Sequence, residues 1–417
     1  MNKKNVIITI FLFWVFYSFG EKNCCDEYSK LKMSSREMDY ILSQTKEMEI
    51  EEKFLSEDIT FACGDIKYNN GKLIFCELGD VIYMPLRPIP LIINGSKRQV
   101  LAPCWDLFWQ YLKQFNLPVW LVGDIDAKHI GALDKFSNLD GYISKSLSTL
   151  SKDPFFEKRC HEKIATTQNN LNCKGIIVYK FLEIEKRACN DVLKFQGVHA
   201  DFLHVNSLAD KILEWKDATY KMFECAGLSA FIPRFRIYST EYSPELIKDI
   251  LTTFSGSDVL VIKPIFSSGG RGINFIEKGK LAAFLNLILN EKDKIPDAFS
   301  KELTFWKEND PKFFLVSDFV QSNVVYKNNN PYDPTMRVIF ILRHSKGKIY
   351  TTCVAGCWML PPKTLNDKCS SLERRHISTF VKNSDVCVDE KTWTNVSGIL
   401  YNVLPSLYHA ILKQCKA

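Results

Sequence analysis

The sequence lacks a marked excess of charge of one sign, an internal repeat and any low-complexity segment. Its net charge is only +6 over 417 residues, and the basic residues are scattered along the chain. A nucleic-acid-binding protein usually concentrates its basic residues on one face, so we expect no nucleic-acid partner. The chain is 46% hydrophobic and 24% charged, which excludes a disordered or fibrous protein. Its length predicts two or three globular domains.

Several motifs that would identify a site at once are missing. No segment fits the GxxxxGK pattern of a P-loop or the GxGxxG turn of dinucleotide-binding proteins. The seven histidines form no HExxH array, and the fourteen cysteines show no paired CxxC spacing of a zinc site. We therefore interpret the cysteines as mostly buried apolar residues, with disulfides left open. Cys353 and Cys357 are expected at a strand edge.

The N-terminus has no apolar run of the ~20 residues that a membrane-spanning helix needs. Lys3 and Lys4 precede an apolar run over 6–19, and small residues and a polar stretch follow. This order predicts a secretory signal peptide or membrane anchor over 1–22, and hence an exported or secreted protein. An uncleaved anchor, with membrane contact only through 6–19, and a buried N-terminal helix or strand stay open as alternatives. An exported protein would not meet a ligand that is abundant only inside cells. Action inside the cytoplasm of a host cell would resolve this conflict.

After a charged helical segment over 23–60, residues 61–200 are predicted to form an N-terminal α/β domain. Short apolar runs alternate there with polar turns, which is typical of strands. Helical segments lie between some of them, and this alternation favours the α/β class. The expected strands are 72–75, 81–83, 91–93, 119–122 and 176–179, and the expected helices are 105–115 and 189–195.

Residues 201–417 are predicted to form a second unit. The strands expected at 338–342 and 349–354 are joined through 344–347 and predict a hairpin. The last helix, over 396–411, carries the apolar stripe of an amphipathic helix, and Pro405 is expected to kink or split it. The other expected elements are helices over 206–223 and 280–289 and strands over 259–262 and 313–316.

The sharpest motif is the segment 263–273, where an apolar strand ends in Lys263 and a loop of small residues follows. Glycines let backbone N–H groups approach an anion closely, and serine hydroxyls add donors. A lysine at the end of a strand can place its ammonium against a phosphate. A plain hairpin uses the same residue types, so that alternative stays open. The loop residues expected to bind phosphate are Ser267, Ser268, Gly269, Gly270, Arg271 and Gly272.

From about 206 to 342 the chain resembles the ATP-grasp superfamily, and in particular its carboxylate–amine ligases, such as ribosomal-protein glutamate ligases and tubulin tyrosine ligases. In that family a strand-borne lysine precedes a flexible Ser/Gly loop that folds over the triphosphate, as Lys263 does here. A second family lysine comes earlier in the chain, where Lys216 is the best match and Lys211 the runner-up. Interpreted without the family, either residue is a solvated helix lysine.

The resemblance also implies a fold: an N-terminal pre-ATP-grasp α/β domain followed by a two-lobed α+β ATP-grasp domain. The small lobe would cover 201–320, and the large lobe would cover 321–417 and could be incomplete. In the family, the backbone of a strand and hinge between the lobes meets the adenine edge, and the segment 316–320 resembles it. By itself this segment is an ordinary buried strand that ends at an exposed acid. The implied hinge contacts are Ser317, Asp318 and Val320.

The segment 332–337 resembles the Asp-x-Arg motif of the same ligases. There the arginine faces the transferring phosphate or the substrate carboxylate, a role that the resemblance gives to Arg337 as the candidate catalytic residue. A guanidinium suits that role because it clamps either anion through two hydrogen bonds. The match departs from the family pattern, since Asp333 lies four residues before the arginine instead of two. Capping of the turn is the alternative for Asp333.

The acidic Glu-x-Asn pair that usually holds Mg²⁺ in the family is missing after Arg337. Asp333 and Glu373 are the remaining candidates for metal ligands, and ordinary loop solvation is the alternative for Glu373. Mg²⁺ bound to nucleotide phosphates often has only one or two protein carboxylates. An incomplete metal set therefore weakens the prediction of catalysis more than the prediction of ATP binding.

The resemblance implies ATP and Mg²⁺ as cofactors and a reaction through an acyl phosphate, which an amine or thiol then attacks. The carboxylate and amine substrates are left unidentified and could be small molecules, peptides or proteins. One alternative is a non-catalytic nucleotide-binding or interaction protein that lacks a complete metal site. Another is a secreted structural protein with a coincidental glycine turn.

Overall fold

The computed structural model describes residues 35–51, 57–80, 88–92, 99–117, 119–122, 141–143, 175–179, 202–205, 216–267, 270–295, 301–309, 311–367 and 385–416. The predicted signal segment over 1–22, strand over 81–83 and helix over 189–195 lie outside these residues. Within the described part, no helix is both long and apolar enough to cross a membrane.

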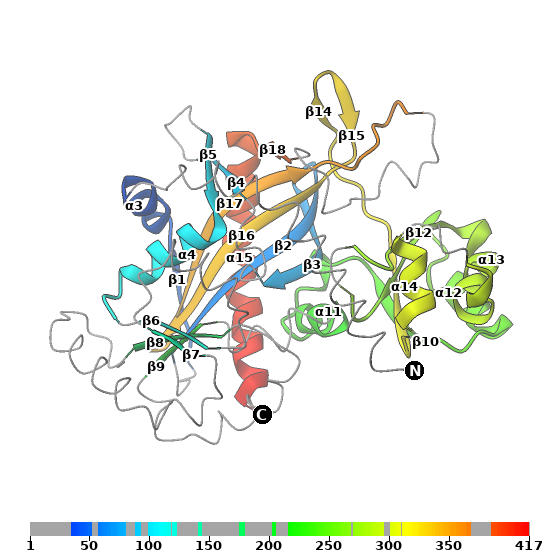
Figure 1. Ribbon diagram of the computed structural model, residues 1–417, viewed down its shortest axis with the longest axis horizontal. Coiled ribbons are helices and arrows are strands. Elements are labelled where there is room, and N and C mark those ends of the chain that lie inside the picture. Colours follow the sequence, from blue (N-terminus) through cyan, green and yellow to red (C-terminus); the bar gives the residue numbers. More distant parts are fainter. Residues whose placement is uncertain are drawn as a thin grey trace.

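A ten-stranded sheet, here called the large sheet, forms the body of the molecule (Figure 1). Its order is β1-β17-β16-β2-β9-β8-β6-β7, with β3 also paired to β2 and β18 to β17. The strands β1, β18, β17, β16, β2 and β3 are joined by antiparallel pairs. On its other side β2 pairs parallel with β9, and the pairs among β9, β8, β6 and β7 are also parallel. The strands are β1 (Lys46–Glu49), β2 (Asp58–Asn69), β3 (Lys72–Asp80), β6 (Val119–Val122), β7 (Gly141–Ile143), β8 (Gly175–Tyr179), β9 (Phe202–Val205), β16 (Thr335–Ser345), β17 (Lys348–Met359) and β18 (Asp385–Cys387).

Two tight hairpins fix the register of the antiparallel part. Asn70 and Gly71 have φ of 49° and 86° and join β2 to β3, while Lys346 and Gly347 have φ of 50° and 75° and join β16 to β17. Two successive residues with positive φ match the right-handed twist of paired strands. The predicted hairpin of 338–342 and 349–354 is thereby confirmed. The strand β2 was not predicted.

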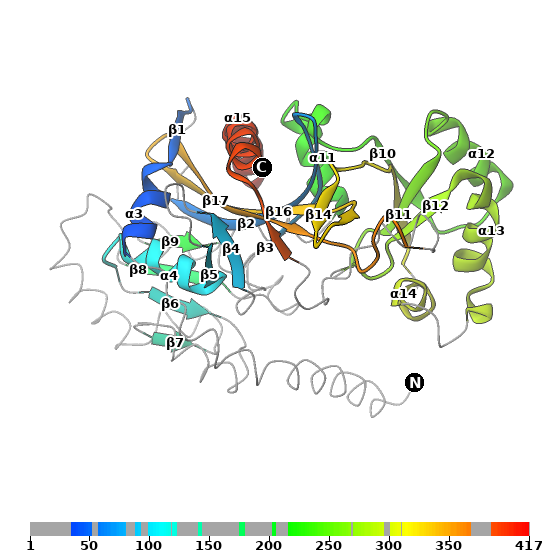
Figure 2. The same ribbon diagram turned by 90° about the horizontal axis from the view of Figure 1, so that it is seen from above.

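The helix α15 (Glu390–Lys416) lies along one face of the large sheet (Figure 2). The predicted splitting of this helix at Pro405 is wrong, because the helix runs through the proline without interruption. A proline inside a helix costs about 3 kcal/mol, and burying one large apolar side chain contributes roughly 1.5–3 kcal/mol, so the packed stripe outweighs the cost. The buried stripe consists of Val396, Leu400, Val403, Leu404, Leu407 and Ile411.

The opposite face of the large sheet meets α4 (Cys104–Lys113), where the ring centroids of Phe61 and Phe108 lie 4.0 Å apart. Next to α4 is α3 (Ser35–Ser43), the described helix within the charged segment predicted over 23–60. The expectation of an edge position for Cys353 and Cys357 is wrong at Cys357, because β16 pairs with β17 there on one side and β18 on the other. Interior strand positions of this kind cannot be inferred from one strand's own sequence.

A four-stranded antiparallel sheet in the order β10-β13-β11-β12, here called the small sheet, forms a separate lobe with three helices (Figure 1). One face packs in a core around Phe314, Trp306 and Ile262, all 0% exposed. Alternate residues such as Lys263 and Ser317 therefore point to the other face. The elements are β10 (Phe235–Ser239), β11 (Val259–Pro264), β12 (Asn274–Glu277), β13 (Phe313–Asp318), α12 (Pro244–Thr253), α13 (Leu281–Leu285, continued by a π-helical turn over Asn286–Asn290) and α14 (Lys301–Asn309).

The helix α11 (Lys216–Cys225) lies between the two sheets (Figure 1). Its Phe223 ring packs against Phe75 of β3 with a centroid distance of 5.0 Å. The chain leaves the small sheet after β13, and Asn323 N donates to Tyr68 O of β2 at 2.9 Å. Two further hairpins are β4 (Pro88–Ile92) with β5 (Gln99–Pro103) and β14 (Val325–Lys327) with β15 (Asn330–Tyr332).

The predicted fold class is confirmed: the chain combines parallel α/β strands with antiparallel sheets in two lobes. The domain boundaries at 60, 200 and 320 stay predictions. The large sheet joins β2 and β3 directly to β16 and β17, so its strands come from both sides of residue 200. This pairing carries two N-terminal strands next to the predicted site residues.

Candidate functional site

The two predicted phosphate-binding lysines are both buried between the lobes: Lys216 is 4% exposed and Lys263 is 6% exposed. Lys216 is the first residue of α11, and Lys263 lies near the end of β11. Lys263 Nζ donates to Tyr220 Oη at 3.1 Å and to the carbonyl oxygen of Cys76 at 3.2 Å. Lys216 is therefore not a solvated helix residue, and that alternative is wrong.

Lys216 lies in an environment that resists its charge. Its Nζ donates to Ser267 O and, at 3.2 Å, to Ser267 Oγ, and it forms an ion pair of 3.5 Å with Glu77. Burial lowers the pKa of Lys216, Glu77 raises it in part, and the neighbouring charge of Lys263 lowers it again. Two cations that repel each other in a buried place attract an anion more strongly than either would alone.

The Ser/Gly loop joins β11 to β12 and is fixed at both ends. At its start, the carbonyl of Ile265 accepts a hydrogen bond from Lys216 N at 3.4 Å. At its end, the carbonyl of Gly272 accepts from Trp306 Nε1 at 2.9 Å and from Asn274 Nδ2 at 3.0 Å. The alternative of a hairpin is thus correct for the backbone, because the loop connects the antiparallel strands β11 and β12. The loop also brings Ser267 to the buried Lys216, which a plain hairpin does not require.

Within this loop, Gly270 and Gly272 adopt φ of 75° and 74°, a conformation that favours glycine. Arg271 lies half-buried between them. Ser268 and Gly269 lie outside the residues that the structure describes. The predicted phosphate contacts of all six loop residues stay predictions.

Arg337 lies on β16, where its guanidinium forms a bidentate ion pair with Asp65 of β2. Nε and Nη2 donate to the two carboxylate oxygens, each at 2.7 Å. Burial by itself would lower the pKa of Arg337, but the charge and hydrogen bonds of Asp65 outweigh it and raise the pKa overall. The arginine is therefore fully charged and held in one orientation.

The hairpin of β2 and β3 links the arginine to the lysines. In register, Arg337 stands opposite Asp65, and Asp65 stands opposite Glu77. Directly paired residues point to the same face of a sheet, so the arginine and both carboxylates share one face. Glu77 reaches Lys216, and the neighbouring Cys76 carbonyl reaches Lys263. We call the resulting group the lysine–carboxylate cluster, and its members are Asp65, Glu77, Lys216, Lys263 and Arg337.

The sequence analysis missed Asp65, Glu77 and Tyr220. The hairpin that carries the two carboxylates has a signal, the Asn70-Gly71 turn between two apolar runs, which is a strong indication of paired strands. Tyr220 has no such signal. It is 1% exposed, its hydroxyl donates to the Cys76 carbonyl at 2.8 Å, and burial raises its pKa well above the ordinary value. Tyr220 thus positions both Lys263 and β3.

The predicted hinge residues lie at the end of β13. Ser317 is 1% exposed, and its Oγ has no hydrogen-bond partner among the described residues. Asp318 accepts from Arg234 at 3.0 and 3.1 Å and also from Ser257. In the β11–β13 ladder Asp318 stands opposite Leu260, three positions before Lys263, which corresponds to roughly 10 Å.

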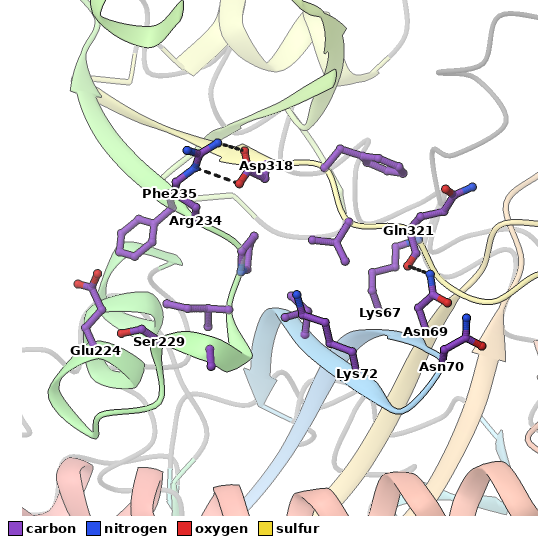
Figure 3. Close-up of a pocket in the computed structure, with 16 residues that line it drawn as sticks. Lys67, Asn69, Asn70, Lys72, Glu224, Ser229, Arg234, Phe235, Asp318 and Gln321 are labelled. Carbon is purple, nitrogen blue, oxygen red and sulfur yellow. Dashed lines mark hydrogen bonds and ion pairs between the residues drawn. The ribbon is translucent and has the colours of Figure 1, made fainter. Parts of the chain in front are cut away.

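An open cavity of about 910 Å³ lies beside this hinge (Figure 3). Asp318, Phe319, Val320 and Gln321 line one side, and the tip of the β2–β3 hairpin lines another. Figure 3 shows Lys67 and Lys72 on the hairpin side and the Arg234–Asp318 pair on the opposite side. Of the predicted hinge residues, Asp318 and Val320 line this cavity, whereas Ser317 is buried and the predicted lysines lie in the buried cluster.

No family model matches the chain, and no curated protein matches its sequence. The chain is similar to several solved structures. One is a D-cycloserine synthetase, 10% identical, covering 71% of this chain and 81% of that one with a TM-score of 0.34. Another is a D-alanyl-alanine synthetase A from Vibrio cholerae, also 10% identical, with 70% and 82% covered and a TM-score of 0.34. A RimK-domain ATP-grasp protein from Sphaerobacter thermophilus is 11% identical, with 71% and 98% covered and a TM-score of 0.27.

The two lobes and the two buried lysines agree with the ATP-grasp resemblance of the sequence. The predicted roles of Lys216, Lys263 and Arg337 are not tested by it. What the structure adds is their common location, with an N-terminal hairpin between them.

The ATP-grasp resemblance gave two candidate metal ligands, Asp333 and Glu373, and the structure describes only the first. Asp333 is 0% exposed, and its Oδ1 accepts from Ser322 N at 3.2 Å and from Lys67 Nζ at 3.4 Å. Both contacts are with residues distant in the sequence, so Asp333 links the segment after β13 to β2. Its metal role and the turn-capping alternative stay predictions. Glu373, like Lys211, lies outside the described residues. Among those that the structure describes, no group of three or more His, Cys, Asp and Glu residues could hold a metal ion.

Proposed function

We propose that the protein binds Mg-ATP between its two lobes and acts as an ATP-dependent carboxylate–amine ligase. The observation that carries the proposal is the burial of two lysines from separate elements beside the Ser/Gly loop. Burying a charge is costly unless an anion compensates it. Glu77 is the one carboxylate that an ion pair joins to Lys216, and no ion pair joins a carboxylate to Lys263 in the described part of the chain. A triphosphate would supply the missing negative charge.

The site residues fit a nucleotide from one end to the other. The hinge after β13 offers backbone groups for the base, and the buried Ser317 hydroxyl has no hydrogen-bond partner in the part of the chain that the structure describes. Lys263 lies roughly 10 Å along the β11–β13 ladder from the hinge residue Asp318. Lys216 would exchange its contact with Glu77 for a phosphate oxygen, and the Ser/Gly loop would cover the phosphates. These placements support the proposal by chemistry and spacing.

Asp65 and Glu77 fit as the protein's ligands for Mg²⁺. They are oxygen donors on adjacent strands, directly opposite each other, and Mg²⁺ on a nucleotide needs one or two carboxylates besides phosphates and water. Glu77 keeps 33% of its side-chain surface exposed and so can exchange partners. The hairpin would thus supply the carboxylates that are missing after Arg337.

Bound Mg-ATP supplies a phosphoryl group that activates a substrate carboxylate. Lys216 and Lys263 neutralise the charge that develops on the phosphoryl oxygens, and they are already oriented for this by Ser267 and Tyr220. Arg337, held by Asp65, orients the carboxylate or phosphate that approaches its face of the sheet. Burial of the lysines excludes water from this place.

Isothermal titration of Mg-ATP into the full chain and its Lys263→Ala variant tests the proposal. We expect saturable binding that the substitution weakens by more than about tenfold, equivalent to ~1.4 kcal/mol, because a buried cation facing the phosphates is lost. Lys280→Ala, at an exposed position after β12, serves as the control and should bind like the unchanged protein. Absence of binding in a folded protein, or an equal effect of both substitutions, would contradict the proposal.

Glu77→Gln tests the metal ligand separately. In the unchanged protein we expect ATP to bind more tightly with Mg²⁺ than with a chelator. In the variant we expect this ratio of affinities to be about tenfold smaller. Glutamine keeps the size of the side chain and removes its charge. Glu245→Gln, an exposed carboxylate on α12, is the matched control. An unchanged Mg²⁺ dependence in Glu77→Gln would show that this carboxylate does not hold the metal.

The second candidate function is that of a non-catalytic nucleotide-binding protein. It is favoured by the ion pairs that already occupy both carboxylates, Asp65 with Arg337 and Glu77 with Lys216. Saturable ATP binding without release of ADP or phosphate, over a range of carboxylate and amine substrates, would identify it.

A further inference from the structure

Two cysteines face each other across neighbouring strands beside the lysine–carboxylate cluster. The short strand β18 pairs antiparallel with the end of β17, and the register places Cys387 opposite Cys357. Cys357 in turn stands opposite Arg337 on β16. Cys387, Cys357 and Arg337 therefore form one row on a single face of the large sheet. Both cysteines are in the thiol form in the structure.

The backbone spacing of such a pair suits a disulfide. Directly opposite residues in antiparallel strands have Cα atoms about 4.5 or 5.5 Å apart, depending on the hydrogen-bonding position. Disulfide-linked cysteines usually have Cα separations of about 4.4–6.8 Å. Both possible spacings fall within this range, so the two sulfur atoms can meet by side-chain rotation with little movement of the backbone.

The other cysteines near this row are poor partners for Cys357. Cys63 shares its face of the sheet, but β16 lies between β2 and β17, and two strand spacings alone separate the two cysteines by at least roughly 9.6 Å. Cys353 lies on the opposite face, where its backbone N–H donates to Tyr401 of α15. Cys225 is exposed on α11. Among the cysteines that the structure describes, Cys387 is the one that the register places opposite Cys357.

We propose that Cys357 and Cys387 form a cross-strand disulfide that fastens β18, and with it the start of α15, to the sheet beside Arg337. The oxidant is a small-molecule disulfide, such as oxidised glutathione. The half-buried Cys387 attacks it as the thiolate, forms a mixed disulfide and releases one small thiol. The Cys357 thiolate then attacks the sulfur of Cys387 and releases the second small thiol. Two protein thiols are oxidised and one small-molecule disulfide is reduced, and the two protons lost by the protein thiols end on the two small thiols.

The proposal does not rest on ATP binding. The bond would close the segment 358–386 into a loop, which restricts the unfolded chain and so stabilises the folded one. Burial raises the pKa of Cys387, so the reaction should be slow at neutral pH and faster in mildly alkaline buffer. Export, predicted from residues 1–22, would bring the pair into a compartment where disulfides persist.

Peptide mapping of the full chain tests the proposal. The protein is incubated with oxidised glutathione or with dithiothreitol at pH 8.5, free thiols are alkylated, and the non-reducing digest is examined by mass spectrometry. We expect a linked peptide pair containing Cys357 and Cys387 after oxidation only. Alkylation of both cysteines after oxidation, or linkage of either to another cysteine, would overturn the proposal.

Thermal unfolding provides a second measurement. We expect dithiothreitol to lower the Tm of the oxidised protein by roughly 5 °C, with no such effect in Cys387→Ser. Cys225→Ser removes an exposed thiol elsewhere and should behave like the unchanged protein. Cys387 is chosen because it is only half-buried, whereas Cys357 is 3% exposed and its replacement could disturb folding. An equal response to dithiothreitol in Cys387→Ser would count against the disulfide.

Discussion

Replacing Asp65 by alanine is expected to lower the free energy of unfolding by about 3 kcal/mol. The substitution leaves the guanidinium of Arg337 buried without the carboxylate that holds it through two bonds of 2.7 Å. The value lies at the lower end of the range for buried pairs, because the Asp65 side chain keeps 18% of its surface exposed. Urea unfolding of both proteins measures the difference, provided that the slope against urea concentration is unchanged.

Two further variants show whether the ion pair is the cause. Asp249→Ala breaks the exposed pair with Arg236 and should cost less than about 1 kcal/mol. The double variant Asp65→Leu/Arg337→Met replaces both charges by apolar groups and should recover most of the lost stability. If Asp65→Ala costs no more than Asp249→Ala, the carboxylate does not stabilise Arg337 in the way that the structure implies.

Gly272→Ala is expected to destabilise the protein by about 2–5 kcal/mol. The residue has a φ of +74°, which costs roughly 1–2 kcal/mol for alanine. An added Cβ would also lie 2.5 Å from Pro264 Cγ and 2.8 Å from Phe305 Cδ1, and overpacking of this kind costs about 1–3 kcal/mol. Thermal or urea unfolding measures the loss. Mg-ATP binding should weaken as well, since the loop must shift where it is anchored to Trp306.

Gly279→Ala is the matched control for the loop. Gly279 lies shortly after β12, and a Cβ there would meet no atom within 4 Å. We expect its unfolding free energy to stay within about 0.5 kcal/mol of the unchanged protein. Similar losses in Gly272→Ala and Gly279→Ala would mean that the positive φ and the close contacts of Gly272 do not determine the stability of the loop.

The sequence by itself determined the features whose cause lies within a few residues. The strand that ends in Lys263, the glycine-rich loop after it and the stripe of α15 all follow from short-range periodicity and from residues that favour particular φ angles. The hairpin of β16 and β17 follows in the same way from its Lys346-Gly347 turn. These patterns also carried the resemblance to ATP-grasp ligases.

Only the tertiary structure decided which residues meet. The strand β2 is buried on both faces, and Ala62, Cys63 and Gly64 interrupt the polar–apolar alternation of its two ends, so its sequence does not reveal its place in the large sheet. Its register against β16 puts Asp65 opposite Arg337, and a shift by one residue would turn the carboxylate to the other face. The continuity of α15 through Pro405 was decided in the same manner, by packing against the sheet. Local propensity acts along the chain, whereas pairing and burial depend on contacts between distant segments, and these placed the two carboxylates beside the lysines.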